Sequence, residues 1–452
     1  MSKSLFSEFD TVSAKAFKQK IQYDLKGADY NKTLVWNTEE GIDVKPFYSS
    51  EDFIENTPIP DHPEDWKIGE EIFILDPKVS ARTANEVLAK GTQTIIFKAD
   101  KPFDVSILFS AIENKSVTLY FRFSFLDKEF LKNLALEAKN RSISVFFGID
   151  IIGNLAVSGN WFNNMEHDFS DLQSILGINN RILTIDASPY LEAGATIVQQ
   201  LAYSLAQANE YLNAYQHELK DQLITFNLAV SSNYFFEIAK IRALRLLYAQ
   251  LAAEYGLPTK CHITVSPAKR NKVIYDYNTN MLRTTTECMS AILGGADTVT
   301  NLPYDALYHK TNEFGQRISR NQLLILREES YFDSKKDAAA GSYYVETLTR
   351  QFAEKALDLF KKIEADGGFL KLLKAGTIQR KIKESAQKEQ ADFDADNTVL
   401  LGINKHPNLD DRMKNDLELY PFLKINPRKT LVIPIIPKRL AEEKEKQRLQ
   451  NE

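Results

Sequence analysis

The stretch Ile182-Leu-Thr-Ile-Asp-Ala-Ser-Pro-Tyr-Leu-Glu-Ala-Gly-Ala-Thr196 contains a strand, a loop and the start of a helix. Its first four residues are apolar or β-branched, which is typical of a buried strand, and Asp186 and Pro189 then interrupt it. After Thr196 the apolar residues recur three or four positions apart, as on one helix face: Ile197, Leu201, Leu205, Ala208 and Leu212. The stretch therefore predicts one β/α unit, with its loop at the strand end where β/α barrels carry their active sites.

That loop is poor in groups that could do chemistry. Asp186 is its one residue suited to acid, base or nucleophilic work, because Pro189 and Tyr190 occupy the middle of the loop. We therefore expect the frame of an active site without its reactive side chains.

Length and composition exclude several classes of protein. The 452 residues, with 44% hydrophobic and 26% charged side chains, predict a large globular chain of one barrel plus appendages or two domains. A net charge of -5 gives no basic stripe for nucleic acid, and no apolar run reaches the ~20 residues that span a bilayer. The N-terminus lacks the apolar core of a signal peptide, and the two cysteines, Cys261 and Cys288, indicate reduced buried thiols. These features predict a cytoplasmic protein.

Strands and helices alternate from about residue 70 to 330, with helical patterns such as Lys128–Lys139, Thr196–Ala214 and Tyr234–Glu254 between them. Alternation of this kind predicts a parallel sheet covered by helices. Seven units at spacings of about 24 to 40 residues favour a (β/α)8 barrel of the TIM type over an open sheet; the eighth strand is not recognisable. The seven candidate strands are Thr94–Phe97, Thr118–Phe123, Ser142–Ile149, Ile182–Ile185, Leu223–Leu228, His262–Val265 and Asp297–Thr300.

Segments of different character flank the barrel, so we divide the chain into residues 1–65, 66–335 and 336–452. The first part has a helical pattern, Ala14 to Leu25, and an extended arm from Leu34 to Tyr48 that is too apolar to be free and must lie on its own barrel or on a partner. A Pro-rich linker, residues 57–63, follows. The last part has a long helix to about Ala365, a second helical segment to Ala375, and an extended linker ending in a charged helix.

The sequence contains no strong motif for binding a nucleotide or a metal ion. No Gly-rich phosphate loop opens any of the helices, and none of the six histidines pairs with another at a metal-ligand spacing. His262, inside a strand, is better explained as a core residue, and His309 follows the seventh strand, where a barrel carries catalytic groups. Arg283 could bind an anion or pair with Glu287, one turn along its helix, and the run 269–272 could meet a phosphate or an acidic partner.

The aromatic residues of the strands suggest a filled barrel axis. Leu119, Phe121 and Phe123 alternate onto one face of their strand, and Phe146 and Phe147 lie on opposite faces of the next. If the Phe-bearing faces point inward, bulky rings fill the axis and no extended ligand can pass through it. This is a hypothesis that an open axial channel would contradict.

Several stretches together resemble the methylmalonyl-CoA mutases. The resemblance spans nearly the whole chain, and the order of its motifs makes it specific. It implies an acyl-CoA mutase barrel with an N-terminal arm that wraps a partner. The matching stretches are Trp36–Tyr48, Glu192–Thr196 with its helix, Asn233–Leu247, Asn280–Gly295, Arg317–Asn321 and Ala340–Glu346.

The sequence departs from the catalytic chains of that family at four places. Where those chains carry Tyr-His before a Met-Gln-Glu-Ala-Gly segment, this sequence has Ser188 and Pro189; where they carry a His after Gly-Gly, it has the run 297–302 with Thr300. Their Arg-Pro-Trp segment is not recognisable around positions 65 to 85. Their Asp-x-His-x-x-Gly motif, which supplies the cobalt ligand, has no counterpart, because no histidine has an Asp two residues before it.

The departures imply a chain without catalytic residues, cofactor or metal of its own, and without a cobalamin-binding domain. We therefore expect the small subunit of a heterodimeric mutase, structural rather than catalytic, with adenosylcobalamin in the large catalytic partner. The alternative is an acyl-CoA-binding mutase chain that works with a separate cobalamin-binding subunit. A third reading is a stand-alone binding barrel, which would be a stable monomer. Neither nucleic acid nor membrane is expected as a partner.

Overall fold

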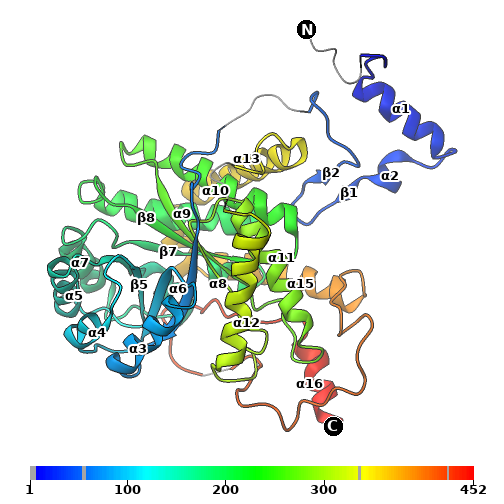
Figure 1. Ribbon diagram of the computed structural model, residues 1–452. Coiled ribbons are helices and arrows are strands. Elements are labelled where there is room, and N and C mark those ends of the chain that lie inside the picture. The colour runs from blue at the N-terminus through cyan, green and yellow to red at the C-terminus, as the bar shows by residue number, and fades with distance from the viewer. Residues whose placement is uncertain (1–6, 53–57, 334–336, 425–426) are drawn as a thin grey trace.

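Eight parallel strands form a closed barrel in the computed structural model, which describes residues 7–52, 58–333, 337–424 and 427–452 (Figure 1). Each strand pairs with its sequence neighbours, β10 pairs with β3, and a bridge between Ile149 and Leu183 joins β6 to β7. The predicted (β/α)8 TIM-type fold is thus confirmed. The barrel strands are β3 Lys67–Phe73, β4 Thr94–Ala99, β5 Thr118–Phe123, β6 Ser144–Gly148, β7 Thr184–Asp186, β8 Ile224–Val230, β9 Cys261–Pro267 and β10 Thr298–Thr300.

The strand that the sequence did not reveal is the first of the barrel, β3. Its two consecutive glutamates break the apolar pattern of a buried strand, and long-range pairs satisfy both of them. Glu70 accepts hydrogen bonds from the guanidinium of Arg320 at 2.8 and 3.1 Å, and Glu71 pairs with Lys98 and Arg122 inside the barrel. This buried strand can therefore contain charged side chains, because residues elsewhere in the fold pair with them.

Helices surround the barrel, and aspartates begin the four that follow strands β3 to β6. The side chains of Asp76, Asp104, Asp127 and Asp150 each accept a hydrogen bond from a backbone N–H of the first helical turn, as N-cap residues do. The outer helices are α3 Pro77–Leu88, α4 Val105–Ala111, α5 Lys128–Asn140, α6 Ile151–Ser158, α7 Met165–Leu176, α8 Ser188–Glu192, α9 Ile197–Tyr215, α10 Tyr234–Glu254, α11 Thr279–Leu293 and α12 Glu313–Leu324, which continues into a π-helical turn, η1 Ile325–Glu329.

The hypothesis that the face of Leu119, Phe121 and Phe123 points into the barrel is wrong. Phe121 packs against Phe109 of α4, in the main core between sheet and helices. The opposite face points inward, so Tyr120 stacks on Phe146 at 4.4 Å, beside Ile96. The helices provide the larger apolar surface, and the bulkiest strand faces turn toward it.

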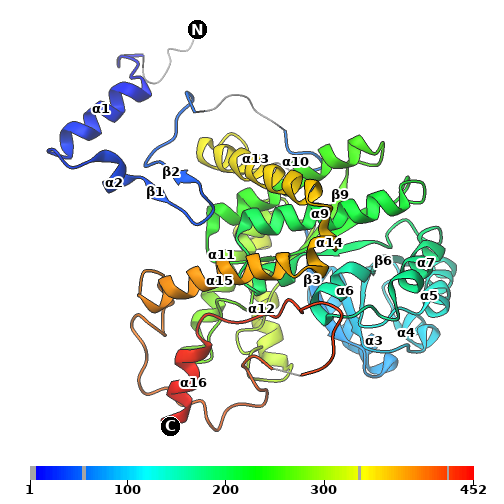
Figure 2. The same ribbon diagram turned by 180° about the vertical axis from the view of Figure 1, so that it is seen from behind.

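The N-terminal arm consists of α1 Ala14–Asp24, α2 Tyr30–Leu34 and the short antiparallel pair β1 Trp36–Asn37 and β2 Asp43–Val44. Its second half lies on its own barrel, where the ring of Trp36 stacks on Phe236 of α10 at 5.5 Å and Ile42 is buried. In contrast, α1 buries no residue and stands away from the barrel in both views (Figures 1 and 2). Residue 57 of the predicted Pro-rich linker lies outside the described residues.

The C-terminal part packs on the barrel. Helix α13 Tyr343–Ala365 lies against α9 and α10, followed by α14 Phe369–Lys374, α15 Thr377–Asp394 and α16 Glu442–Gln450. From Tyr420 to α16 the described residues form no helix or strand, as the predicted extended linker requires, but this stretch is not a free linker. Its backbone N–H groups donate to carbonyls of the barrel, from Ile435 to Ala156 and from Lys438 to Glu192, and it passes below α15 in Figure 2. We call residues 395–441 the tail.

Among the described residues, no helix combines the length and the apolar character needed to cross a membrane.

Candidate functional site

The loop after β7 places Ser188 and Pro189 at the start of α8. The Ser188 hydroxyl donates to Asp186 Oδ1 at 2.6 Å, and the side-chain amide of Asn227 on β8 donates to the same oxygen at 2.7 Å. Proline is well tolerated in the first helical turn, where a backbone N–H would have no intrahelical acceptor. Position 189 therefore presents a ring without a hydrogen-bond donor, and no group there can bond to a carbonyl.

An ion-pair network fills the barrel next to this loop. Arg122 on β5 joins its two sides, since Nη2 donates to Asn227 Oδ1 at 2.7 Å and Nη1 donates to Glu71 Oε1 at 3.0 Å. Lys98 on β4 donates to Glu71 Oε2 at 2.6 Å. Burial raises the pKa of Glu71, but the two cations and their hydrogen bonds outweigh burial, so the pKa is lowered overall. The network therefore holds an ionised carboxylate between two cations at neutral pH.

This network was not predicted, although the sequence carries a signal for part of it. Lys98 and Arg122 stand at inward positions of otherwise apolar strands, in register with each other across β4 and β5. Polar residues at such positions indicate a polar barrel interior. Their common partner, Glu71, lies on the strand that the sequence did not reveal.

Thr300 lies on β10, buried, and its hydroxyl donates to the carbonyl of Val265 at 3.3 Å. Within the described residues, no hydrogen bond joins it to Ser188 or Pro189. The structure thus brings Ser188 into the network of Asp186 and Asn227 and leaves Thr300 in a separate, strand-to-strand contact.

Below the ion pairs, an aromatic layer closes the barrel. His262 on β9 lies beside the ring pair Tyr120–Phe146, and its Nε2 is 2.6 Å from the Tyr120 hydroxyl. Burial lowers the pKa of His262 despite the influence of Asp297. His262 is a core residue, as its position inside a strand indicates.

Asp150 has a strongly perturbed carboxyl, and sequence analysis missed it. Burial raises its pKa to about 6, although the bonds it accepts from Asp186 N, Gly153 N and the Tyr211 hydroxyl lower it. Gln207 also donates to it, at 2.7 and 2.8 Å. These contacts begin α6 and fix it against α9, so we assign Asp150 a structural role. Its signal in the sequence was an Asp directly after a predicted strand.

The other candidates from the sequence have internal partners. His309 lies between Asp305 and Asp416, at 3.2 and 3.3 Å, and Arg283 donates to Thr279, Asn280 and the carbonyl of Leu401. Glu287 pairs with Lys272 at 2.8 Å rather than with Arg283. No group of three or more His, Cys, Asp or Glu residues that could hold a metal ion occurs in the described ranges.

Comparison with known proteins gives the family. A family model described as methylmalonyl-CoA mutase matches residues 104–448. This chain belongs to the methylmalonyl-CoA mutase family. It is 33% identical to the methylmalonyl-CoA mutase small subunit of Porphyromonas gingivalis, over 89% of this chain and 71% of that protein. It is also 28% identical to a methylmalonyl-CoA mutase of Cereibacter sphaeroides, over 88% of this chain and 64% of that protein, and so spans less than two thirds of that mutase.

Both kinds of mutase chain are among the relatives. The methylmalonyl-CoA mutase large subunit of P. gingivalis is 33% identical over 48% of this chain and 31% of that protein. The fuller coverage of the small subunit makes it the more informative relative for this chain.

Mutases of this family depend on cobalamin. Among the described residues, no histidine has the sequence pattern of a cobalt ligand. Four of the six histidines have defined partners: His62 lies near Asp337, His167 bonds to Asn164, and His262 and His309 are placed as described above. The remaining two, His217 and His406, are exposed, and neither follows an Asp by two positions. The residues present therefore do not fit the cofactor.

Proposed function

We propose that this chain is the small subunit of a heterodimeric, cobalamin-dependent methylmalonyl-CoA mutase, which interconverts methylmalonyl-CoA and succinyl-CoA. The observation that carries the proposal is the match to the P. gingivalis small subunit over 89% of this chain. In this proposal the large catalytic subunit is the partner, it holds adenosylcobalamin, and the complex works in propionate metabolism in the cytoplasm.

The barrel interior supports the proposal of a structural rather than catalytic role. Ser188, Pro189 and Thr300 are, in this proposal, the remains of an active site, and Pro189 has no group to polarise a thioester carbonyl. The Glu71–Lys98–Arg122 network and the ring pair Tyr120–Phe146 occupy the space along the axis. An extended ligand would have to displace ion pairs and aromatic rings, both of which are costly to separate.

The exposed apolar residues of the N-terminal arm support the proposal of a permanent partner. Helix α1 buries no residue, while Phe9, Val12, Phe17 and Tyr23 are all at least 46% exposed. Exposed apolar side chains concentrated on one segment are typical of an interface. An obligate interface of this kind buries on the order of 2,000 Å² or more.

The test is co-expression with the large mutase chain from the same source. We expect the two chains to co-purify as a heterodimer with mutase activity, and this chain alone to have none. Deletion of residues 1–29 should release the partner, whereas Leu136→Ala, which trims an exposed side chain on α5, should not. Turnover by this chain alone would contradict the structural role, and full activity of the large chain without this one would contradict the subunit assignment.

The alternative, an acyl-CoA-binding chain that works with a separate cobalamin-binding subunit, makes a different prediction. It requires saturable binding of methylmalonyl-CoA to this chain without the large subunit. Calorimetric titration distinguishes the two, because the structural proposal expects methylmalonyl-CoA to bind no more tightly than its adenosine phosphate moiety alone. It also expects Pro189→His alone not to change this result.

A further inference from the structure

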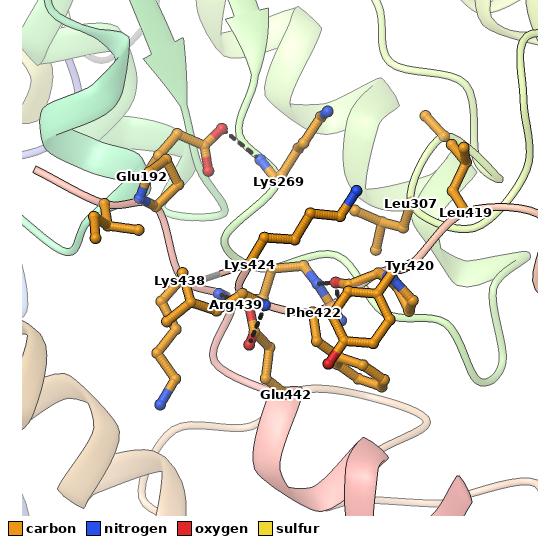
Figure 3. A pocket seen from close by; sticks show the side chains of 15 residues that line it. Glu192, Lys269, Leu307, Leu419, Tyr420, Phe422, Lys424, Lys438, Arg439 and Glu442 are labelled. Carbon is orange, nitrogen blue, oxygen red and sulfur yellow. Dashed lines mark hydrogen bonds between the residues drawn. The ribbon is translucent and has the colours of Figure 1, made fainter. Parts of the chain in front are cut away.

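A cleft of about 600 Å³ separates the tail from the loops that follow β7, β9 and β10 (Figure 3). The loops contribute Glu192, Lys269 and Leu307, and the tail contributes residues 419–424 and 436–439. Sites for small molecules have volumes of roughly 300–1,000 Å³, so the cleft has the size of such a site. It lies outside the barrel interior and does not involve Ser188, Pro189 or Thr300.

Its tail wall is fixed by hydrogen bonds. Arg439 is buried, and its guanidinium donates to the carbonyl of Pro421 at 3.1 and 3.3 Å and to the carbonyl of Lys272 at 3.0 Å. The backbone N–H of Leu423 donates to Glu442 at 3.0 Å. The cleft is therefore formed without a ligand, and little ordering is needed on binding.

Two lysines in the cleft form no salt bridge, although Glu192, which accepts a hydrogen bond from Lys269 N at 2.8 Å, lines the same cleft. Within the described part of the chain, neither Lys269 nor Lys424 has its ammonium group within 4 Å of a carboxylate, and both side chains extend toward the same side of the cleft in Figure 3. Lys438 extends the other way and pairs with Glu443 at 3.2 Å. Ammonium groups that line one cleft without a salt bridge attract an anion, and lysine is a common ligand for phosphate.

The same cleft offers an exposed aromatic ring and an apolar floor. Tyr420 is 58% exposed, and its ring is held edge-on to that of Phe422, with centroids 5.5 Å apart. Leu307 and Phe422, both buried, also line the cleft. An exposed ring of fixed orientation can stack on a flat heterocycle.

We propose that this cleft binds a nucleoside phosphate, with the phosphates between Lys269 and Lys424 and the base on Tyr420. The site is independent of the proposed mutase function, because it uses neither the barrel interior nor the N-terminal arm. It would give this chain a ligand of its own, held between the tail and the barrel loops.

The test is calorimetric titration of the full chain with ADP and, separately, with pyrophosphate, at low ionic strength. We expect saturable binding of ADP below about 1 mM. The double variant Lys269→Ala/Lys424→Ala should weaken both ligands at least tenfold. Tyr420→Ala should weaken ADP roughly tenfold and leave pyrophosphate unchanged, since only the nucleoside can stack. Lys438→Ala is the matched control and should change either affinity by less than threefold.

All the substituted side chains lie on the surface of the cleft, and a thermal unfolding scan of each variant checks that the fold is retained. Absence of ADP saturation at about 1 mM would overturn the proposal. So would ADP binding that the double lysine variant leaves intact, because the ligand would then lie elsewhere. Equal effects of Tyr420→Ala on ADP and pyrophosphate would overturn the assignment of a nucleoside.

Discussion

The carboxylate of Glu40 accepts a hydrogen bond of 2.7 Å from the backbone N–H of Ile197, and so joins the N-terminal arm to the first turn of α9. A second bond, from Val198 N at 2.9 Å, makes the contact bidentate. Free N–H groups and the positive end of the helix dipole both favour a carboxylate at this position. One residue of the arm thus caps a helix of the barrel that is more than 150 residues away in the sequence.

Glu40→Ala should destabilise the chain by about 1 kcal/mol, because two N–H groups lose their acceptor. The measurement is the free energy of unfolding from urea titration, together with the rate of proteolytic cleavage within residues 1–52, which should rise. Glu39→Ala is the control, since Glu39 is exposed and its nearest cation, Lys388, is 3.8 Å away. Equal effects of the two substitutions would show that the cap does not hold the arm.

Gly69→Ala should destabilise the barrel by about 1–3 kcal/mol, because the added methyl group overpacks the junction of β3 and β10. A Cβ atom at position 69 would lie 2.9 Å from a methyl carbon of Thr298 and 2.9 Å from one of Thr300. Gly177→Ala is the matched control, because a Cβ there meets no atom within 4 Å. Thermal unfolding of both variants checks the prediction, and equal midpoints would contradict close packing at Thr300.

Arg122→Met should cost about 1–3 kcal/mol, since Asn227 loses a donor and Glu71 loses one of its two cations. The control is Arg82→Met, which removes an exposed pair with Glu86 at 4.0 Å and should change the stability by less than about 0.5 kcal/mol. Urea unfolding measures both. If the two variants were equally stable, the interior network would not hold the strands together.

His309 should make stability depend on pH. Burial lowers its pKa, but the hydrogen bonds to Asp305 and Asp416 outweigh burial, so the pKa is raised above 6.5 overall. The folded state then binds the proton more tightly than the unfolded state. The stabilisation is complete below pH 6.5 and is lost as the pH rises through the folded-state pKa.

The measurement is the free energy of unfolding of the wild-type chain minus that of His309→Gln, from pH 5 to pH 9. We expect this difference to fall as the pH rises. A His309 difference that grew with pH would contradict the paired imidazolium.

Local patterns predicted most of the barrel, and long-range pairs explain what they missed. The bounds predicted for α10, Tyr234 to Glu254, agree with the structure because apolar residues recur along all of it and no Gly or Pro interrupts it. Strand β3 was missed because Glu70 and Glu71 find their partners on α12, β4 and β5. Helix α15 was missed because its surface is mostly polar and only Ile378, Gln379, Ile382 and Phe393 are buried.

The candidate site, too, was predicted only where its signal in the sequence is local. The loop of Ser188 and Pro189 was placed correctly after a strand, because an apolar run followed by Asp and Pro is a local signal. The network of Glu71, Arg122 and Asn227 depends on how the barrel closes, since it joins β3, β5 and β8. No window of sequence contains all three residues.

The contact between α16 and the loop after β9 has a consequence for synthesis on the ribosome. The backbone N–H of Ile274 donates to the buried carboxylate of Glu445 at 2.9 Å, across 171 positions. At about 5–20 residues per second, roughly 10–30 s pass between emergence of the donor and of its acceptor. During that interval α16 does not yet cover the loop after β9. We expect a chaperone to bind the growing polypeptide at this exposed surface.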